Sequence, residues 1–334
     1  MSTSSGSGAS SGSSDSAVVA GRGALFIGFA KGWFMVAGFV QQVLLTRIIG
    51  LAEFGAFAVV NNFISIVNNT VVQATIQSIS KFTAEDERHA DAVKRAGLQI
   101  QLGVGIALAA VLFLGAPLIA GFVKAPHYTT YFRIAALIPL LYALYAVFVG
   151  SANGLRRFST QAGFDVAFST AKTILLLGAA ALWRVSGAFV GFAAAAVVIL
   201  VVAARVMRLP SQVGGAASDT FPKQKLGRYM VAVVAYGLLL NLALNYDQPL
   251  LHHFAGAVDP ATAGEVAARY QALRTLALLP YQALLVITFV IFPLVSRSTF
   301  IEDKAATGAY VTQTLRYALI LAVGMGICLG ARPA

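Results

Sequence analysis

The feature that most constrains this chain is a series of nine apolar runs, each close to the length that crosses a bilayer. A hydrocarbon core of about 30 Å takes roughly 20 apolar residues as a helix. The runs are continuous and do not alternate with a period of two, so they predict helices and not the strands of a membrane barrel. We therefore expect an all-α, polytopic membrane helix bundle. The nine runs lie at residues 24–45, 54–79, 97–123, 132–150, 162–183, 187–206, 229–251, 266–295 and 311–330.

The composition excludes the soluble classes of protein. Only 11% of the 334 residues are charged and 58% are hydrophobic, whereas an ordinary soluble domain has about 25% charged residues. A soluble fold of this size still exposes about a quarter of the surface of its unfolded chain, so it could not bury this much apolar surface. Cys328 is the single cysteine, so no intrachain disulfide can form.

Lysine and arginine differ in density between successive loops, which predicts an orientation. The loops after the first, third and fifth runs contain only Arg47, Lys124 and Arg184. The positive-inside rule places the lysine- and arginine-rich loops and the N-terminus in the cytoplasm, as in a multi-pass protein of the cytoplasmic (inner) membrane. This orientation accounts for most of the net charge of +11 without a nucleic-acid partner. The rich loops contain Lys81, Arg88, Lys94, Arg95, Arg156, Arg157, Arg208, Lys223, Lys225, Arg228, Arg297 and Lys304.

Changes of composition divide the chain into four parts. Residues 1–20 are mostly Ser, Gly and Ala and predict a disordered tail. Residues 21–206 contain six apolar runs and predict a first six-helix bundle. Residues 207–228, with two prolines and three glycines, predict a cytoplasmic hinge loop. Residues 229–334 predict a partial second bundle of three helices.

A weak internal repeat relates the two bundles. The turn after the first run, with Gly50, Glu53 and Gly55, is similar to the turn after the seventh, with Gly256, Gly264 and Glu265. The offset is close to 210 residues. Transporters are often built from such repeats. If the second half repeats the first, we expect a C-terminally truncated chain that lacks about three helices.

Polar side chains follow one face of the second run. An amide that faces lipid costs several kcal/mol, so this face must meet other helices or line a wet cavity. Packing between helices would use some of these residues. A full-length row favours a water-lined cavity over packing alone. The row consists of Asn61, Ser65, Asn68, Asn69, Gln73 and Gln77.

Ionisable side chains also occur within the runs, where they are costly and usually face the interior of a bundle. Asp165 and Lys172 are seven residues apart and nearly on one face, which would allow a structural bridge between them. Lys31, Asp247 and Arg274 lie in three other runs. Lysine and arginine outnumber aspartate in this set, so the set indicates a cavity suited to an anionic ligand.

Two stretches of the sequence resemble a known family. Residues 46–57, Thr-Arg-Ile-Ile-Gly-Leu-Ala-Glu-Phe-Gly-Ala-Phe, resemble the first-loop signature of polysaccharide-repeat flippases, the Wzx-type O-antigen and exopolysaccharide translocases. Residues 268–297, which include Phe-Pro-Leu-Val-Ser-Arg, are similar to the eighth helix of that family. The family belongs to the MATE-like (MOP) superfamily of two six-helix bundles. The resemblance covers about residues 20–330 and implies a MATE-like two-bundle architecture with an incomplete second bundle.

The resemblance also implies a function. Two bundles would alternate in access and move a polyprenyl-diphosphate-linked oligosaccharide from the inner to the outer leaflet, with no enzymatic step and no cofactor. Fixed cations in a low-dielectric cavity would bind the diphosphate. The candidates for this contact are Lys31, Lys172 and Arg274. The candidates for hydrogen bonds to sugar hydroxyls are Asn61, Asn68, Asn69 and Gln73. Asp247 and Asp165 are the candidates for coupling to protons or sodium, or for counter-charges.

Other functions fit parts of the sequence. A MATE-type cation-coupled multidrug antiporter needs a carboxylate-lined or apolar cavity, but only Asp165 and Asp247 are acidic within the runs. A membrane-embedded polyprenyl-dependent glycosyltransferase or ligase needs an acid, base or metal cluster. The sequence has no His-Glu-x-x-His motif or Walker loop, and His252 and His253 would point about 100° apart on a helix. A non-transporting truncated homologue is the remaining alternative. We predict no catalytic residue and no metal site.

Overall fold

A computed structural model describes residues 10–208, 221–260, 262–278, 308, 312, 315–320 and 323–324. No strand occurs among these residues, which confirms the all-α prediction. The helices are α1 (Ser10–Ile49), α2 (Leu51–Glu85), η1 (Glu87–His89), α3 (Ala90–Phe122), η2 (Pro126–Tyr128), α4 (Thr129–Ala135), α5 (Leu137–Gly154), α6 (Phe158–Val206), α7 (Lys223–Asn245), α8 (Asp247–Val258) and α9 (Ala263–Ala277).

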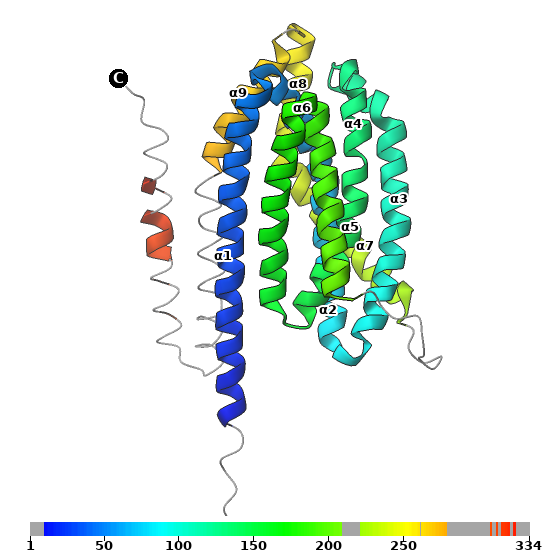
Figure 1. Cartoon of the computed structure of the whole chain (residues 1–334), viewed down its shortest axis with the longest axis vertical. Coiled ribbons are helices and arrows are strands. Elements are labelled where there is room, and N and C mark those ends of the chain that lie inside the picture. Colours follow the sequence, from blue (N-terminus) through cyan, green and yellow to red (C-terminus); the bar gives the residue numbers. More distant parts are fainter. Residues whose placement is uncertain are drawn as a thin grey trace, which may run out of the picture.

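The helices run up and down between two ends (Figure 1). We call the end at which α1 passes into α2, near Gly50, the upper end, and the end at which α2 passes into η1, near Asp86, the lower end. Six stretches of the described chain are long and apolar enough to cross a membrane. They are Phe26–Ile49, Leu51–Glu85, Glu87–Phe122, Pro126–Gly154, Phe158–Val206 and Lys223–Asn245.

The helix α6 contains the two predicted runs at 162–183 and 187–206, folded back on each other. Trp183 and Arg184 leave the helical conformation, and Arg184 has a φ of 52°. A Cβ atom on Gly187 or Gly191 would clash with the backbone of the opposite leg, so glycine permits the close approach of the two legs. The turn thus separates two antiparallel spans, as the sequence predicts.

A break at Tyr246 divides the predicted run at 229–251, so the prediction of one helix there is wrong. The helix α7 ends at Asn245 and α8 begins at Asp247. Pro249 has no N–H group to donate to the carbonyl of Asn245, and it is tolerated in the first turn of a new helix. The break falls in the stretch Asn-Tyr-Asp-Gln-Pro at 245–249, where hydropathy drops, so the sequence carried a local sign that the predicted run passed over.

The structure differs from the predicted N-terminal tail, and it describes only part of the predicted C-terminal spans. The backbone is helical from Ser10, whereas the sequence predicts a disordered tail over 1–20. Extending an existing helix adds one hydrogen bond per residue without a new nucleus, so polar residues can continue α1. Most of the predicted spans at 311–330 and 266–295 and the loop residues 209–220 lie outside the described residues.

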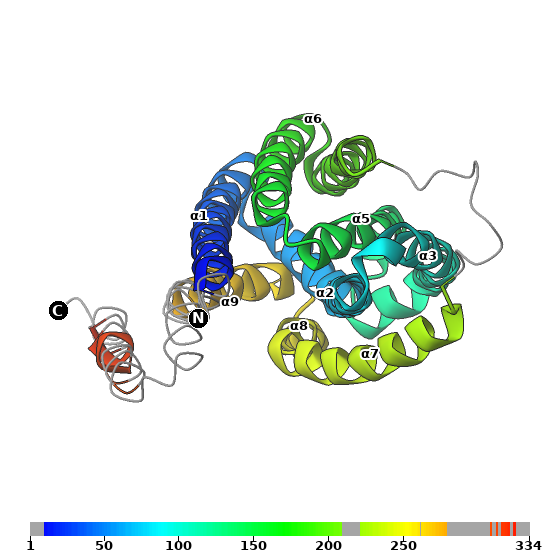
Figure 2. The ribbon, with the colours of Figure 1, turned by 90° about the horizontal axis from the view of Figure 1, so that it is seen from below.

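The helix α2 lies at the centre of the bundle, with α5, α7 and α9 around it (Figure 2). Its buried side chains form the core; the rings of Phe57 and Phe189, for example, are 5.0 Å apart. Apolar side chains on the outer helices face away from the protein: Leu118 on α3 is 80% exposed and Leu239 on α7 is 71% exposed. Such surfaces are expected of helices that contact lipid.

The helices α2 and α9 run in the same direction and meet at equivalent positions. Gly55 contacts Gly264, and Asn62 contacts Gln271; both pairs are 209 residues apart. If two repeats are related by a two-fold axis, equivalent residues of the two repeats meet at that axis. Such residues are separated in the sequence by one constant number, the length of the repeat. The offset is close to the 210 residues that relate the two turns in the sequence.

Candidate functional site

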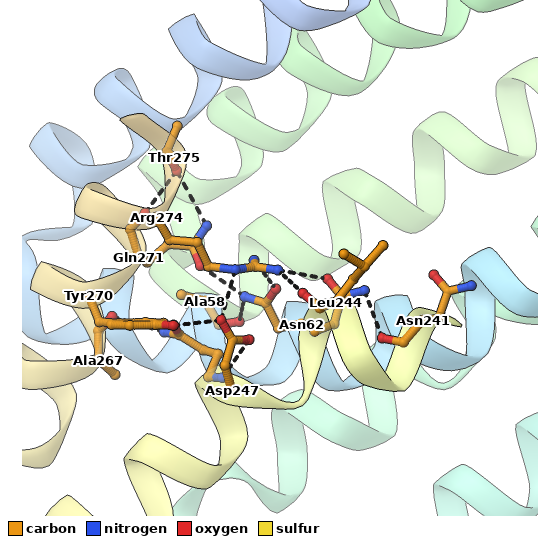
Figure 3. A network of polar contacts seen from close by, with 12 residues as sticks. Ala58, Asn62, Asn241, Leu244, Asp247, Ala267, Tyr270, Gln271, Arg274 and Thr275 are labelled. Carbon is orange, nitrogen blue, oxygen red and sulfur yellow. Dashed lines mark hydrogen bonds and ion pairs between the residues drawn. The ribbon is translucent and has the colours of Figure 1, made fainter. Parts of the chain in front are cut away.

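Arg274 on α9 is the centre of a polar network between helices (Figure 3). Its side chain is 14% exposed, and its Nε atom lies 3.1 Å from Oδ2 of Asp247. Nη1 donates to Oδ1 of Asn62 at 2.9 Å. Nη2 donates to Oδ1 of Asn245 at 3.2 Å and to the carbonyl of Leu244. Acceptors from α2, α7 and the first residue of α8 therefore surround the guanidinium group.

Further hydrogen bonds connect this network to α1 and along α9. The hydroxyl of Tyr270 donates to Oδ2 of Asp247 at 2.6 Å. Nδ2 of Asn62 donates to Oε1 of Gln271 at 3.0 Å. The hydroxyl of Thr275 donates to Oε1 of Gln42 on α1 at 2.7 Å. The polar network, as we define it, consists of Gln42, Asn62, Asn245, Asp247, Tyr270, Gln271, Arg274 and Thr275.

A second charged group lies between α1 and α6. Nζ of Lys31 is 2.8 Å from Oδ2 of Asp165, and the two side chains are 40% and 17% exposed. Lys172, two turns further along α6, has its Nζ atom 4.2 Å from the ring centroid of Phe192, a cation–π contact. The bridge between Asp165 and Lys172 that the sequence would allow is not formed, because Asp165 pairs with Lys31. Among the described residues, Lys172 has no carboxylate partner.

The amides assigned to sugar recognition lie on α2 and vary in exposure. Asn61 and Asn69 are half-buried, and Gln73 is exposed. Asn68 is 8% exposed, and its Oδ1 atom has no hydrogen-bond partner in the described structure. The α2 residue in the polar network is instead Asn62, about 100° around the helix from Asn61.

The predicted site residues therefore fall into separate groups. In the part of the chain that the structure describes, no hydrogen bond or ion pair links Lys31 or Lys172 with Arg274. A hollow of about 670 Å³ lies at the turn of α6, and none of the predicted site residues lines it. Its lining residues are Leu182, Trp183, Arg184, Ser186 and Val190. The described residues contain no group of three or more His, Cys, Asp or Glu that could hold a metal ion.

The sequence interpretation missed most of the polar network. Tyr270, Gln271, Arg274 and Thr275 recur three and four residues apart, so they share one face of a helix. That spacing was a usable signal for α9. Asn62 also had a signal, because Ser65 and Asn69 of the row of amides lie three and seven residues further along α2, nearly on the same face.

These observations define a class of protein: a multi-pass membrane protein whose helices enclose charged and amide side chains, as transporters do. Residues 20–299 match the family described as polysaccharide biosynthesis protein, and the chain belongs to that family. The match confirms the resemblance to MATE-like polysaccharide flippases. Comparison with curated proteins gives no significant match.

Solved structures of transporters share the fold. An outward-facing multidrug resistance MATE family transporter of the MOP superfamily is 14% identical, with a TM-score of 0.66 over 91% of this chain and 71% of that chain. MATE in the straight conformation is 14% identical, with a TM-score of 0.65 over 92% and 70%. A MOP superfamily transporter from Pyrococcus furiosus, described as having a binding pocket of reverse polarity, is 13% identical, with a TM-score of 0.57 over 93% of this chain and 82% of that chain. At these identities the likeness establishes the fold alone.

Proposed function

We propose that this chain is a flippase that moves polyprenyl-diphosphate-linked oligosaccharides across the cytoplasmic membrane by alternating access, without an enzymatic step. The family and the fold support a membrane transporter of polysaccharide biosynthesis. The observation that carries the choice of substrate is Lys172, a cation among membrane helices that pairs with no carboxylate of the described chain. A diphosphate would supply the missing negative charge.

The charge balance between α1 and α6 favours an anion. Asp165 offsets Lys31, so Lys172 leaves this region with one net positive charge. In a low-dielectric interior such a charge attracts an anion far more strongly than it would in water. We assign the diphosphate to Lys31 and Lys172, and we assign the sugar hydroxyls to Asn61, Asn68 and Asn69, with Gln73 on the same helix.

Arg274 has a different role in this proposal. Protein acceptors already bind most of its N–H groups, so it can contact a phosphate only after the polar network opens. One carboxylate oxygen of Asp247, Oδ2, contacts both the guanidinium group of Arg274 and the hydroxyl of Tyr270. Binding of a proton or sodium ion at Asp247 would weaken both contacts, which makes Asp247 our candidate for ion coupling.

The orientation follows the charge of the loops. The lower end carries most of the lysine and arginine residues, so we place it and the N-terminus in the cytoplasm. The upper end, with α8 and the turn of α6, then faces outward. In this orientation Lys31 lies in the cytoplasmic half of its membrane span, Phe26–Ile49, and Asp165 lies in the cytoplasmic half of the first leg of α6. A substrate from the inner leaflet would arrive there first.

The test is export of surface polysaccharide from bacteria that lack their own flippase and express the full chain. We expect Lys172→Met to reduce export at least tenfold and Lys172→Arg to retain most of it, with equal amounts of both variants in the membrane. Normal export by Lys172→Met would contradict the proposal.

A multidrug antiporter is the second candidate, because MATE multidrug transporters are among the structures that share the fold. The two carboxylates within the predicted apolar runs, Asp165 and Asp247, are already paired with cations. A cationic drug would have to compete with Lys31 or Arg274. Efflux of a cationic dye by vesicles containing the chain would favour this candidate, and we expect none.

A further inference from the structure

The helix α8 reaches across the upper end and docks on the last turn of α3. His252 on α8 is 2% exposed, and its Nδ1 atom lies 2.8 Å from the carbonyl oxygen of Val123. Its Nε2 atom is 3.3 Å from the hydroxyl of Tyr128. A neutral imidazole with the proton on Nδ1 satisfies both contacts, since it donates to the carbonyl and accepts from the hydroxyl.

His253 makes the neighbouring contact. Its Nδ1 atom donates to the carbonyl of Phe122, and its ring stacks on the ring of Phe122 with centroids 4.8 Å apart. One turn further along α8, an ideal Cβ atom on Gly256 would lie 3.1 Å from Cβ of Lys124. We call the contacts of His252, His253 and Gly256 with Phe122, Val123 and Lys124 the upper clasp.

The upper clasp satisfies carbonyl groups that the sequence leaves without donors. The last carbonyls of a helix have no partner within the helix. Pro126 lacks the N–H group that would otherwise bond to the carbonyl of Phe122 four residues earlier. The two imidazoles supply donors to this carbonyl and to the next one, so α3 depends on α8 for the end of its hydrogen-bond pattern.

The helix α8 is also attached at its other end. Asp247, its first residue, binds Arg274 and Tyr270 of α9. The break at Tyr246 separates α8 from α7, so the two helices need not move together. The helix α8 therefore connects α9 to the end of α3, across the boundary between the first six spans and the helices that follow residue 221.

We propose that the upper clasp is a latch that closes the outward end of the transporter, and that His252 and His253 must leave the carbonyls of α3 before that end can open. This inference rests on the proposed alternating-access function. Each transport cycle would break the clasp once and form it again.

A reversible crosslink tests the latch. Lys124→Cys and Gly256→Cys, in a full chain in which Cys328 is Ser, would place two Cβ atoms close to the separation of about 3.8 Å that a disulfide needs. The control pair is Gly105→Cys and Leu140→Cys, which joins α3 to α5 within the first six spans; there the corresponding Cβ separation is 3.6 Å. Oxidation should stop polysaccharide export in the first pair, a reducing agent should restore it, and the control pair should export in both states.

Undiminished export by the oxidised Lys124→Cys, Gly256→Cys chain, with the crosslink shown to be complete, would overturn the latch. Loss of export in both oxidised pairs would also overturn it, because the effect would then not be specific to the clasp.

A distance measurement tests the latch without any substrate. Spin labels at Thr130 and Val258, both exposed, report the separation of α4 and α8 in lipid nanodiscs, and labels at Thr130 and Leu182 provide a control within the first six spans. We expect the His252→Ala, His253→Ala chain to add a longer distance for the first pair and leave the second unchanged. An unchanged first distance would overturn the latch. A longer distance in a chain that never exports polysaccharide would support the latch and contradict the proposed function.

Discussion

Gly55 and Gly264 pack backbone against backbone at the upper crossing of α2 and α9. A Cβ atom on Gly55 would clash with the carbonyl of Gly264, and a Cβ atom on Gly264 would lie 3.1 Å from the carbonyl oxygen of Ala52. Neither contact can be relieved by turning a side chain, since the opposing atoms belong to the backbone. The absence of side chains at both positions lets Asn62 and Gln271 hydrogen-bond two turns below.

Gly55→Ala should therefore separate α2 from α9. We expect a loss of about 1–3 kcal/mol of stability, the usual cost of overpacking, measured by thermal unfolding in nanodiscs. Gly115→Ala is the matched control, because no atom lies within 4 Å of the added Cβ on α3. Alanine is a better helix former than glycine, so the control should be neutral or slightly stabilising. Equal stability of the two variants would contradict this account of the crossing.

The polar network makes a prediction about coupling. Arg274→Gln leaves Asp247 and Asn62 without their main donor, and we expect a cost of about 1–3 kcal/mol. Asp247→Asn should cost less, because Asn62, Asn245 and the Leu244 carbonyl still accept from Arg274. The double variant should be less destabilised than the sum of the two single variants. Strict additivity in thermal unfolding would indicate that the ion pair contributes nothing.

The spans could be predicted because runs of apolar residues in lipid have few alternatives to helix. The limits of the spans could not be predicted equally well. The chain of α6 folds back at Arg184, a charged residue that interrupts the apolar run. Nε of Arg184 donates to Oε1 of Glu53 at 2.6 Å. The break at Tyr246 falls in a short polar stretch, residues 245–249, and the predicted run passed over it because apolar residues continue on both sides. Pro249 was the local signal, but a proline in a membrane helix can also produce only a bend.

The candidate site was predictable as a set of residue types and not as a set of contacts. Burying Lys31, Asp165 and Arg274 requires partners, and the sequence alone indicates that much. Which partner each one meets depends on how helices far apart in the chain pack together. Asp165 meets Lys31 of α1 and not Lys172 of its own helix. Asn62 shares a helical face with Ser65 and Asn69, but which amide of that face meets Arg274 and Gln271 depends on where α9 packs.

The upper clasp should weaken in acid. Burial lowers the pKa of His252 most strongly, the positive charge of nearby His127 lowers it further, and the hydrogen bond to the carbonyl of Val123 opposes both. His253, Tyr128 and Lys124 are titratable groups of the same region, and none of the three supplies a negative charge at neutral pH. Because the docked pKa is below the unfolded value of about 6.5, protons bind preferentially to the undocked form. Docking is therefore fully stable above that value and weakens as the pH falls below it.

The measurement is the distance between spin labels at Thr130 and Val258 from pH 8 to pH 5. We expect the longer distance to become more populated as the pH falls. In His252→Asn, the Nδ2 group can still donate to Val123 but does not titrate in this range, so the pH dependence should become flatter. An identical pH dependence in this variant would show that another group is responsible.

The ion pair of Lys31 and Asp165 makes the last prediction, on how a substrate would leave. Asp165 competes with any anion for Lys31, so Asp165→Asn should strengthen binding of inorganic pyrophosphate about three- to tenfold, or about 0.6–1.4 kcal/mol. The cost in stability should be small, about 0–1 kcal/mol, because Lys31 is 40% exposed and can be solvated. Tighter binding without a lower barrier slows release, so polysaccharide export should fall while affinity rises. Asp165→Glu keeps the competing charge and should resemble the unmodified chain in both measurements. Weaker binding of pyrophosphate by Asp165→Asn would show that the carboxylate supports the anion site and does not compete with it.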